Sequence, residues 1–251
     1  MHSRVPGRVK ELRLKTSAKK KQTLGVKLGK KLRAPFDRLF ERQSLVPNAR
    51  FLDPALFTWG QALSDHWKEV QAELDSIMAE RDSLPELSKV SPDHRRIAAD
   101  GKWKSFFFKA YGYRVGPNAR RCPKTAALID SIPGVLVAFF SVMEPGIRVP
   151  RHRGLTKALL NVHLGLRIPG PPDQCGISVG GEVRGWEEGK VLVLDDTYHH
   201  EVWNKTDRPR AVLFLQIRRP VRPLGRLLGD AFLGVVRYTN YVQEGRRLLE
   251  A

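Results

Sequence analysis

The chain has 251 residues, 41% of them hydrophobic, and a formal net charge of +18. This length supports one domain with a substantial core. Two cysteines, Cys122 and Cys175, exclude a disulfide scaffold and predict two reduced thiols, as in a cytoplasmic protein. The sequence contains no apolar run that would span a bilayer and no secretory signal, so we expect a cytoplasmic protein, at most peripheral to the inner face of the membrane.

The N-terminal segment is strongly basic. Residues 1–34 hold twelve Lys or Arg against one acid, Glu11, which gives this segment +11 of the total charge. We expect residues 1–45 to form a basic, partly disordered arm. Such an arm is attracted to an anionic membrane, where each basic residue contributes about 1 kcal/mol, or to nucleic acid by the same counterion effect. Charge alone does not choose between these partners.

A helical support is predicted over residues 53–80. Asp53-Pro54 has the form of a helix start, with Asp as the N-cap and Pro at the first helical position. Apolar residues then recur at spacings of three and four over about 62–80, which predicts an amphipathic helix: Leu63, Trp67, Val70, Leu74, Ile77 and Met78. We expect its apolar stripe to pack against the rest of a domain that covers residues 46–220.

Residues from about 103 to 218 show the pattern of a β-rich core. Apolar and aromatic runs separated by Gly and Pro predict strands at 103–111, 135–143, 157–168, 175–179, 182–186, 190–194, 201–203 and 210–217, and Cys122–Asp130 predicts a short helix. Gly180-Gly181 predicts a hairpin turn. This series predicts a mainly β fold, a double-stranded β-helix of the jelly-roll or cupin-like type, with flanking N-terminal and C-terminal helices.

Residues 221–251 form a C-terminal tail in which leucines and other apolar residues alternate with arginines. This composition predicts an amphipathic helix. It either packs on the barrel or lies in a membrane interface.

Strand parity places several polar side chains on one interior face. Because alternate residues of a strand share a face, Asn161 and His163 lie opposite the apolar residues of the same strand. Arg210 shares a face with two apolar residues at the head of the last strand. A buried Arg needs an anion. Taken alone, a salt bridge to Asp207 is favoured over a bound dicarboxylate.

Histidines in this region are candidate metal ligands, because neutral imidazole binds Fe(II), Zn and Cu. His152 and His200 lie 48 residues apart, so only long-range strand pairing can bring them together. Taken singly, each histidine is more often a surface or core residue.

The order of the motifs resembles a known family. Ser141-x-Met143-x-Pro-Gly is followed by Pro-x-His152-x-Gly, His163-Leu-Gly-Leu, Trp-x-x-Gly-Lys, Asp-Asp-x-x-x-His200-Glu-Val-Trp and finally Arg210. This series resembles the aspartyl/asparaginyl β-hydroxylase family of Fe(II)- and 2-oxoglutarate-dependent dioxygenases, over about residues 103–220. The resemblance implies an enzyme that uses Fe(II), 2-oxoglutarate as cosubstrate and O2 to hydroxylate an unactivated C–H bond.

The resemblance also implies roles for individual residues. It makes His152 and His200 the catalytic iron ligands. It makes Ser141, His163 and Arg210 the residues that bind 2-oxoglutarate, with Met143 nearby and the Arg210 fork paired with the distal carboxylate.

Two departures from common patterns bear on this site. Non-haem iron is usually held by two His and one carboxylate, but Gly154 stands where that carboxylate would be; the family resembled also has Gly there and is understood to use water. Family members often carry Arg where this chain has Asn161, which predicts a weaker hold on the cosubstrate. Asp195, Asp196 and Glu201 are nearby acids that either support the iron site or belong to turns and surface.

The substrate is open to three interpretations. Bacterial relatives of the family resembled hydroxylate acyl chains of lipid A or ornithine lipids, and the basic arm and tail favour an acyl chain of an anionic or amino-acid-containing membrane lipid. The alternative is β-hydroxylation of Asp or Asn residues in peptides or proteins. A third is a non-catalytic jelly-roll binding module with a nucleic-acid-binding arm, which the two histidines and Arg210 disfavour.

Overall fold

A computed structural model of the chain describes residues 24–91, 94–98, 100–238, 242–244 and 247–248. The chain divides into two compact units, Met1–Ala34 and Pro35–Ala251. The predicted basic arm lies mostly in the first unit, and its residues 1–23 fall outside the described residues. The described helices include none that is long and apolar enough to cross a membrane.

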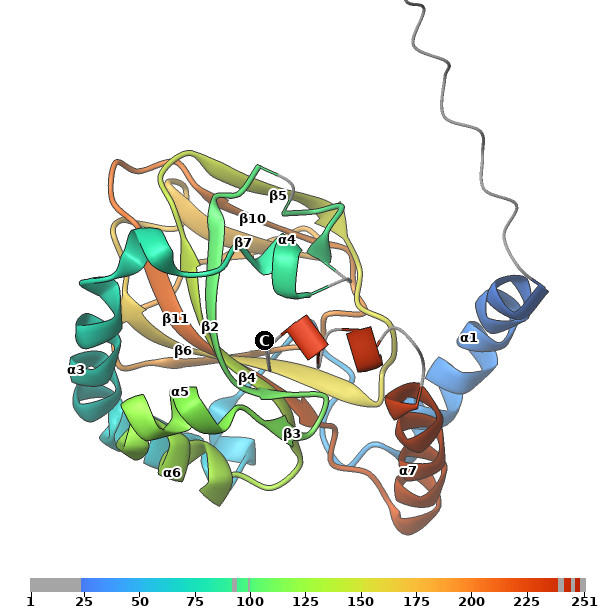
Figure 1. Cartoon of the computed structure of the whole chain (residues 1–251). Coiled ribbons are helices and arrows are strands. Elements are labelled where there is room, and N and C mark those ends of the chain that lie inside the picture. Colours follow the sequence, from blue (N-terminus) through green and yellow to red (C-terminus); the bar gives the residue numbers. More distant parts are fainter. Residues whose placement is uncertain (1–23, 92–93, 99, 239–241, 245–246, 249–251) are drawn as a thin grey trace, which may run out of the picture. The chain divides into compact units, whose positions relative to one another are not determined.

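Two antiparallel β-sheets form the body of the second unit (Figure 1). The larger sheet has the strand order β1-β9-β6-β11-β4-β2-β3, and the smaller has the order β5-β10-β7-β8. The strands are β1 (Phe51–Leu52), β2 (Trp103–Ala110), β3 (Tyr113–Arg114), β4 (Val135–Met143), β5 (Ile147–His152), β6 (Leu159–Arg167), β7 (Cys175–Val179), β8 (Glu182–Arg184), β9 (Val191–Leu194), β10 (His200–Asn204) and β11 (Arg210–Arg218). The predicted mainly β, jelly-roll fold with flanking helices is confirmed.

The larger sheet is buried on both faces. On its outer face, residues such as Leu160, Val162 and Leu164 join a core that also contains Val70, Leu74 and Ile77 of the predicted helical stripe. On its inner face, Phe139, Val212 and their neighbours pack against Val149, Ile177 and Val202 of the smaller sheet. Alternate residues of these strands therefore contribute to two different cores, one beneath the helices and one between the two sheets.

Helices cover the outer face of the larger sheet. They are η1 (Pro54–Leu56), α2 (Gly60–Asp65), α3 (Trp67–Met78), η2 (Arg81–Ser83), α5 (Gly116–Arg121) and α6 (Pro123–Ser131); α3, α5 and α6 lie together on this face in Figure 1. The short α4 (Leu87–Val90) instead contributes Leu87 and Val90 to the core between the sheets. Asp53 caps the short η1, since its carboxylate accepts from the Ala55 N–H at 2.9 Å. The single helix predicted over 62–80 is wrong, because the chain turns at His66 between α2 and α3.

Two helices lie at the ends of the described chain. α1 (Leu24–Gln43) occupies much of the segment predicted as a disordered arm, and α7 (Pro223–Arg237) follows β11 as the amphipathic helix predicted for the tail. The second unit begins at Pro35, earlier than the expected boundary at residue 46, because Phe40 and Asp37 are buried in it. Gly180 and Gly181 form the predicted hairpin turn with φ of 57° and 89°.

Candidate functional site

Two histidines meet on adjacent strands of the smaller sheet. His152 at the end of β5 is the register partner of His200 at the start of β10, and the ring centroids lie 4.1 Å apart. The pairing register shifts between His200 and Val202, because β5 has one extra residue at this point. Val149 therefore pairs with Val202, and His152, three residues further along β5, pairs with His200. This β-bulge turns the His152 ring toward His200 instead of leaving it on the outer face with Arg148 and Pro150.

The hydrogen bonds of both rings leave Nε2 as the lone-pair nitrogen. Nδ1 of His152 lies 2.8 Å from the Pro150 carbonyl oxygen, and Nδ1 of His200 lies 3.0 Å from that of Tyr198. A carbonyl oxygen only accepts, so Nδ1 must donate in each ring. Burial lowers the pKa of His152 and lowers that of His200 to about 4, so both rings stay neutral. This is the tautomer in which imidazole binds a metal through Nε2.

Arg210 is buried between the two sheets without a carboxylate. Its side chain is 2% exposed, and its Nε has no hydrogen-bond partner among the described residues. Its terminal NH2 approaches Met143 Sδ at 3.0 Å, and its guanidinium lies 4.2 Å from the Trp186 ring centre. Burial lowers its pKa to about 10. The salt bridge to Asp207 expected from the residue alone is wrong, because Asp207 is exposed and pairs with Arg208.

His163 presents a second donor in the same interior. Trp186 Nε1 donates to its Nδ1 at 3.0 Å, and indole N–H can only donate. The neutral ring therefore carries its hydrogen on Nε2, a buried atom with no partner among the described residues. Burial, with Arg210 nearby, lowers the pKa of His163 far below its usual value and keeps the ring neutral. Unsatisfied donors at His163 and Arg210 suit an anionic ligand.

Ser141 and Met143 lie beside these donors on β4. In the register of the larger sheet, Met143 pairs with Arg210, and Ser141 pairs with Val212, two residues further along β11. Trp103 Nε1 donates to the Ser141 hydroxyl oxygen at 2.9 Å, which leaves the hydroxyl hydrogen to donate elsewhere. Ser141 is therefore a third potential donor on this interior face.

The space beside Gly154 is filled by the side chain of another residue. A Cβ built on Gly154 would lie 2.1 Å from Asp196 Oδ1, so the Asp196 carboxylate occupies the space that a side chain at 154 would need. The Gly154 N–H also donates to the Asp196 carbonyl oxygen at 2.7 Å. Asn161 Nδ2 donates to Asp196 Oδ2 at 3.2 Å, and Gln216 holds the Asn161 oxygen at 3.2 Å. Asn161 thus positions a carboxylate beside the histidine pair.

The other two acids have different partners. Asp195 is buried and pairs with Lys157 at 3.0 Å and with Arg219. Glu201 points to the outer surface of the smaller sheet and pairs with Arg148 at 2.8 Å. Of the three acids considered from the sequence, Asp196 alone meets the histidine segment, while Asp195 stabilises the loop that carries it.

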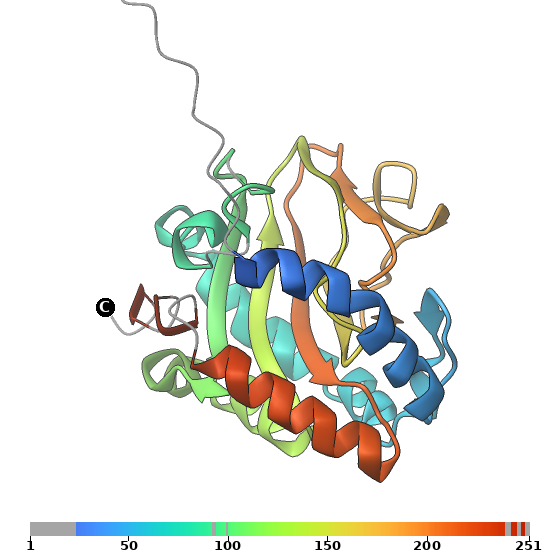
Figure 2. The ribbon, with the colours of Figure 1, turned by 90° about the vertical axis from the view of Figure 1, so that its right-hand side faces the viewer.

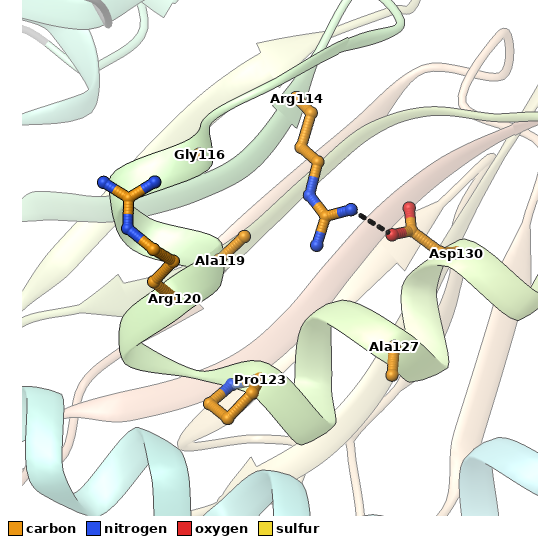
Figure 3. A pocket seen from close by; sticks show the side chains of 7 residues that line it. All are labelled: Arg114, Gly116, Ala119, Arg120, Pro123, Ala127 and Asp130. Carbon is orange, nitrogen blue, oxygen red and sulfur yellow. Dashed lines mark ion pairs between the residues drawn. The ribbon is translucent and has the colours of Figure 1, made fainter.

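Apart from this arrangement, the described residues form a surface depression and no metal-binding cluster. A surface depression is lined by Arg114, Gly116, Ala119, Arg120, Pro123, Ala127 and Asp130 (Figure 3), with Arg114 paired to Asp130 at 3.0 Å. It contains none of the residues predicted for the site. The described residues also hold no cluster of three or more His, Cys, Asp or Glu side chains of metal-binding form.

The six site residues predicted from the sequence fall into two groups. One is the histidine pair, His152 and His200, on the smaller sheet. The other comprises four residues on the inner face of the larger sheet: Ser141, Met143, His163 and Arg210. Sequence reasoning missed the roles of Trp103 and Trp186, whose indole donors fix the polarity of Ser141 and His163. The Trp-x-x-Gly-Lys motif was the available signal for Trp186.

The model of the aspartyl/asparaginyl beta-hydroxylase family matches residues 64–220. The chain belongs to this family. As a family member it falls among hydroxylases, and the match covers both predicted ligand histidines and Arg210.

Individual relatives differ in how much of their length is aligned. The chain is 36% identical over 198 residues to "Ornithine lipid ester-linked acyl 2-hydroxylase" of Rhizobium tropici, which covers 79% of this chain and 70% of the relative. It is 30% identical over 165 residues to human "Aspartyl/asparaginyl beta-hydroxylase", which covers 64% of this chain and 21% of the relative. This alignment thus spans about a fifth of the human protein's length.

Solved structures with some likeness are more distant. One is a DMSP lyase, DddQ, from Ruegeria pomeroyi, at 16% identity and a TM-score of 0.33, covering 49% of this chain and 51% of that one. Another is the cupin domain of Cnp3 from Schizosaccharomyces pombe, at 12% identity and a TM-score of 0.31, covering 41% of this chain and 64% of that one.

Proposed function

We propose that this family member is an Fe(II)- and 2-oxoglutarate-dependent hydroxylase that acts on an acyl chain of an anionic or amino-acid-containing membrane lipid. One observation carries the proposal: a single barrel holds two neutral imidazoles with Nε2 lone pairs and a buried guanidinium without a carboxylate. The first arrangement suits a divalent metal, and the second suits a diacid.

The donor sets fit iron and the cosubstrate. His152 and His200 would hold the metal, and Asp196, whose carboxylate fills the space beside Gly154, would offer a hydrogen-bond acceptor on that side. Arg210, His163 and Ser141 would bind the carboxylates of 2-oxoglutarate, beside Met143. When bound, iron and 2-oxoglutarate activate O2, so that one oxygen atom enters a substrate C–H bond and the other enters succinate, with loss of carbon dioxide.

The protein's own part is binding and exclusion of water. Trp186 holds His163 in the tautomer that donates to an anion, and Trp103 orients the Ser141 hydroxyl. The apolar residues Phe139 and Val212 keep this side of the barrel dry. In a dry interior the Arg210 charge interacts strongly with a carboxylate, which accounts for selection of a diacid over a neutral molecule.

The inner face beside His163 also favours an apolar substrate. Phe214 is the register partner of His163, and its ring centre lies 4.7 Å from that of Phe139 and 5.1 Å from that of His163, with the rings tilted in both pairs. Phe214, Val137 and Leu192 are only partly buried, and all three pack on the interior core. Together with the 36% identity to an ornithine lipid acyl 2-hydroxylase, this supports an acyl chain over the alternative, an Asp or Asn side chain of a peptide.

Metal and cosubstrate binding provide the first test. Anaerobic protein with Fe(II) and 2-oxoglutarate is expected to show a visible charge-transfer band that is lost in His152→Ala and in His200→Ala. His199→Ala is the matched control, because His199 is exposed and adjacent in sequence. A band unchanged in both ligand variants would reject the assignment.

Product analysis decides the substrate. After turnover, lipids and Asp- or Asn-containing peptides are examined by mass spectrometry. A gain of one oxygen on a fatty acyl chain supports the lipid proposal. A gain found only on Asp or Asn supports the peptide alternative.

A further inference from the structure

One side of α7 packs against other residues of the second unit. Ideal Cβ atoms on Gly225 and Gly229 would lie 2.8 Å from Gln43 Cβ and 3.3 Å from the Phe40 ring, so α7 approaches the last turns of α1 closely. Phe232 adds a ring contact to Phe36, with centroids 4.9 Å apart. The second unit therefore contains a helix pair, α7 against the Pro35–Gln43 part of α1 (Figure 2).

The opposite side of α7 carries an open apolar stripe. Leu224, Leu227, Ala231 and Val235 follow one another at spacings of three and four, so they share one helix face. Tyr238, three residues after Val235, continues the row directly after the last residue of α7. Four of them are large and strongly exposed, at 53% for Leu224, 67% for Leu227, 71% for Val235 and 80% for Tyr238. Water-soluble surfaces rarely expose so many large apolar residues in one row unless they bind something.

The charges around this stripe are positive. Arg226 is exposed on α7, Arg222 is exposed just before the first residue of α7, and Arg38 and Arg42 are exposed on the neighbouring part of α1. The acid of α7, Asp230, is paired with Arg218. Long arginine side chains reach several ångströms along a surface with their heads in the polar layer. An apolar stripe with cations on both adjoining surfaces matches an anionic bilayer, whose interface combines acyl chains with negative headgroups.

α7 is also connected to the end of the barrel at which the two histidines lie. It follows β11 after Arg219, which pairs with Asp195, the residue before Asp196. Its neighbour α1 contacts the loop after His152, because Asp37 Oδ1 accepts from the Lys157 N–H at 3.1 Å. Ion pairs and backbone hydrogen bonds thus connect the helix pair to both chain segments that carry the histidines. A bilayer held by α7 would lie against this end of the molecule.

We propose that the stripe Leu224, Leu227, Ala231, Val235 and Tyr238 docks the protein on an anionic bilayer and presents the barrel's site to membrane lipids. The docking itself stands on the surface of α7, and the presentation of substrate rests on the function proposed above. α7 lies in the interface plane with its stripe among the acyl chains, while Arg222 and Arg226 meet headgroups.

Vesicle binding of the full chain tests the docking. We expect Leu227→Glu with Val235→Glu to weaken binding to phosphatidylglycerol/phosphatidylcholine vesicles roughly ten- to hundredfold, since two apolar groups leave the interface and two anions enter it. The matched control is Leu56→Glu with Val183→Glu, which places the same charges on exposed apolar residues elsewhere. Equal weakening in both double variants would show general electrostatics, including that of the N-terminal segment, and overturn the proposal.

A reporter variant locates the contact. Leu227→Trp is expected to shift its emission to shorter wavelength and to be quenched by brominated acyl chains, relative to the unsubstituted chain and to Val183→Trp. No extra quenching in Leu227→Trp overturns the docking. The oligomeric state without vesicles is measured in parallel. A dimer that the glutamate substitutions convert to monomer would assign the stripe to a second copy of the chain and likewise overturn it.

Turnover separates this proposal from the hydroxylase proposal. The stripe variants are expected to keep activity on acyl lipid dispersed in detergent and to lose it on the same lipid in vesicles. Absence of turnover by the unsubstituted chain in both forms rejects the function while leaving the vesicle-binding result to decide the docking. Equal turnover of stripe variants in both forms rejects presentation of substrate by α7.

Discussion

Trp186 Nε1 donates a hydrogen bond to Nδ1 of His163 over 3.0 Å, and this fixes the imidazole in the tautomer opposite to that of His152 and His200. The two ligand candidates offer a lone pair at Nε2, because each donates from Nδ1 to a backbone carbonyl. His163 offers an N–H at Nε2. One side-chain type is thus set for metal binding in two places and for anion binding in the third, by the partner of its other nitrogen.

Trp186→Phe tests this orientation. The ring and its stacking on Arg210 are kept, but the N–H that fixes His163 is lost. We expect the dissociation constant of 2-oxoglutarate to rise about tenfold, which corresponds to the loss of one buried hydrogen bond. The affinity for Fe(II) should stay unchanged. Titration calorimetry measures both. Trp203→Phe is the control, since its indole donates to Pro172 on the outer surface. A shift in iron affinity instead would contradict the assignment.

Arg210→Met is expected to stabilise the protein without cosubstrate. Arg210 is a buried charge with no carboxylate near it, and an apolar residue of similar length avoids its desolvation. The free energy of unfolding in urea should rise by about 1–4 kcal/mol. Added 2-oxoglutarate should stabilise the unsubstituted chain but not the variant. A variant that is less stable than the parent and still stabilised by 2-oxoglutarate would rule out an anion site at Arg210.

Gly154 and Asp196 are expected to be coupled. Gly154→Ala places a Cβ in the space of the Asp196 carboxylate and should lower stability by about 1–3 kcal/mol. Combining it with Asp196→Gly should restore most of that loss, a coupling that a double-mutant cycle measures. Gly116→Ala is the control, because the nearest atom to its added Cβ lies 3.5 Å away. Additive losses would mean that the two residues do not compete for one space.

Gly154→Asp with Asp196→Gly extends this test to the metal. The exchange moves the carboxylate to the position used in the two-His, one-carboxylate iron sites. We expect tighter Fe(II) binding than in Gly154→Asp alone, where both carboxylates crowd the same space. Equal affinities in the two variants would place the carboxylate away from the metal.

The metal-free protein is expected to lose stability as the pH falls from 6.5 toward 4. Burial lowers the pKa of His94 to about 4, and His94 binds Ser91 at 2.8 Å through Nδ1. Between these pH values the unfolded chain binds a proton at His94 that the folded chain does not, so the free energy of unfolding drops by up to roughly 1.4 kcal/mol per pH unit for this residue.

Urea unfolding across this pH range measures the slope. His94→Gln should make it shallower by about one proton, while exposed His199→Gln should leave it unchanged. A slope unaffected by His94→Gln would show that this imidazole titrates alike in the folded and unfolded chain.

Alternation and turn residues were enough to predict most strands of the barrel. The apolar residues Leu160, Val162 and Leu164 specify one buried face, and a regular strand then places Asn161 and His163 on the other. The same parity put Arg210 inside. These are local properties, because a strand's period of two is set by its own backbone. The resemblance, carried by six separated motifs, added the roles that parity could not supply.

Other features required the assembled chain. The β-bulge that brings the His152 ring to His200 appears only when β5 pairs with β10, since regular alternation would put His152 on the outer face. Asp207 was the expected partner of Arg210, but it is solvated and bound to Arg208. The break between α2 and α3 and the helix α1 were also missed. Sequence determined which side chains a strand can offer to its interior; pairing between distant strands decided which met, because register and desolvation are properties of contacts that no single segment contains.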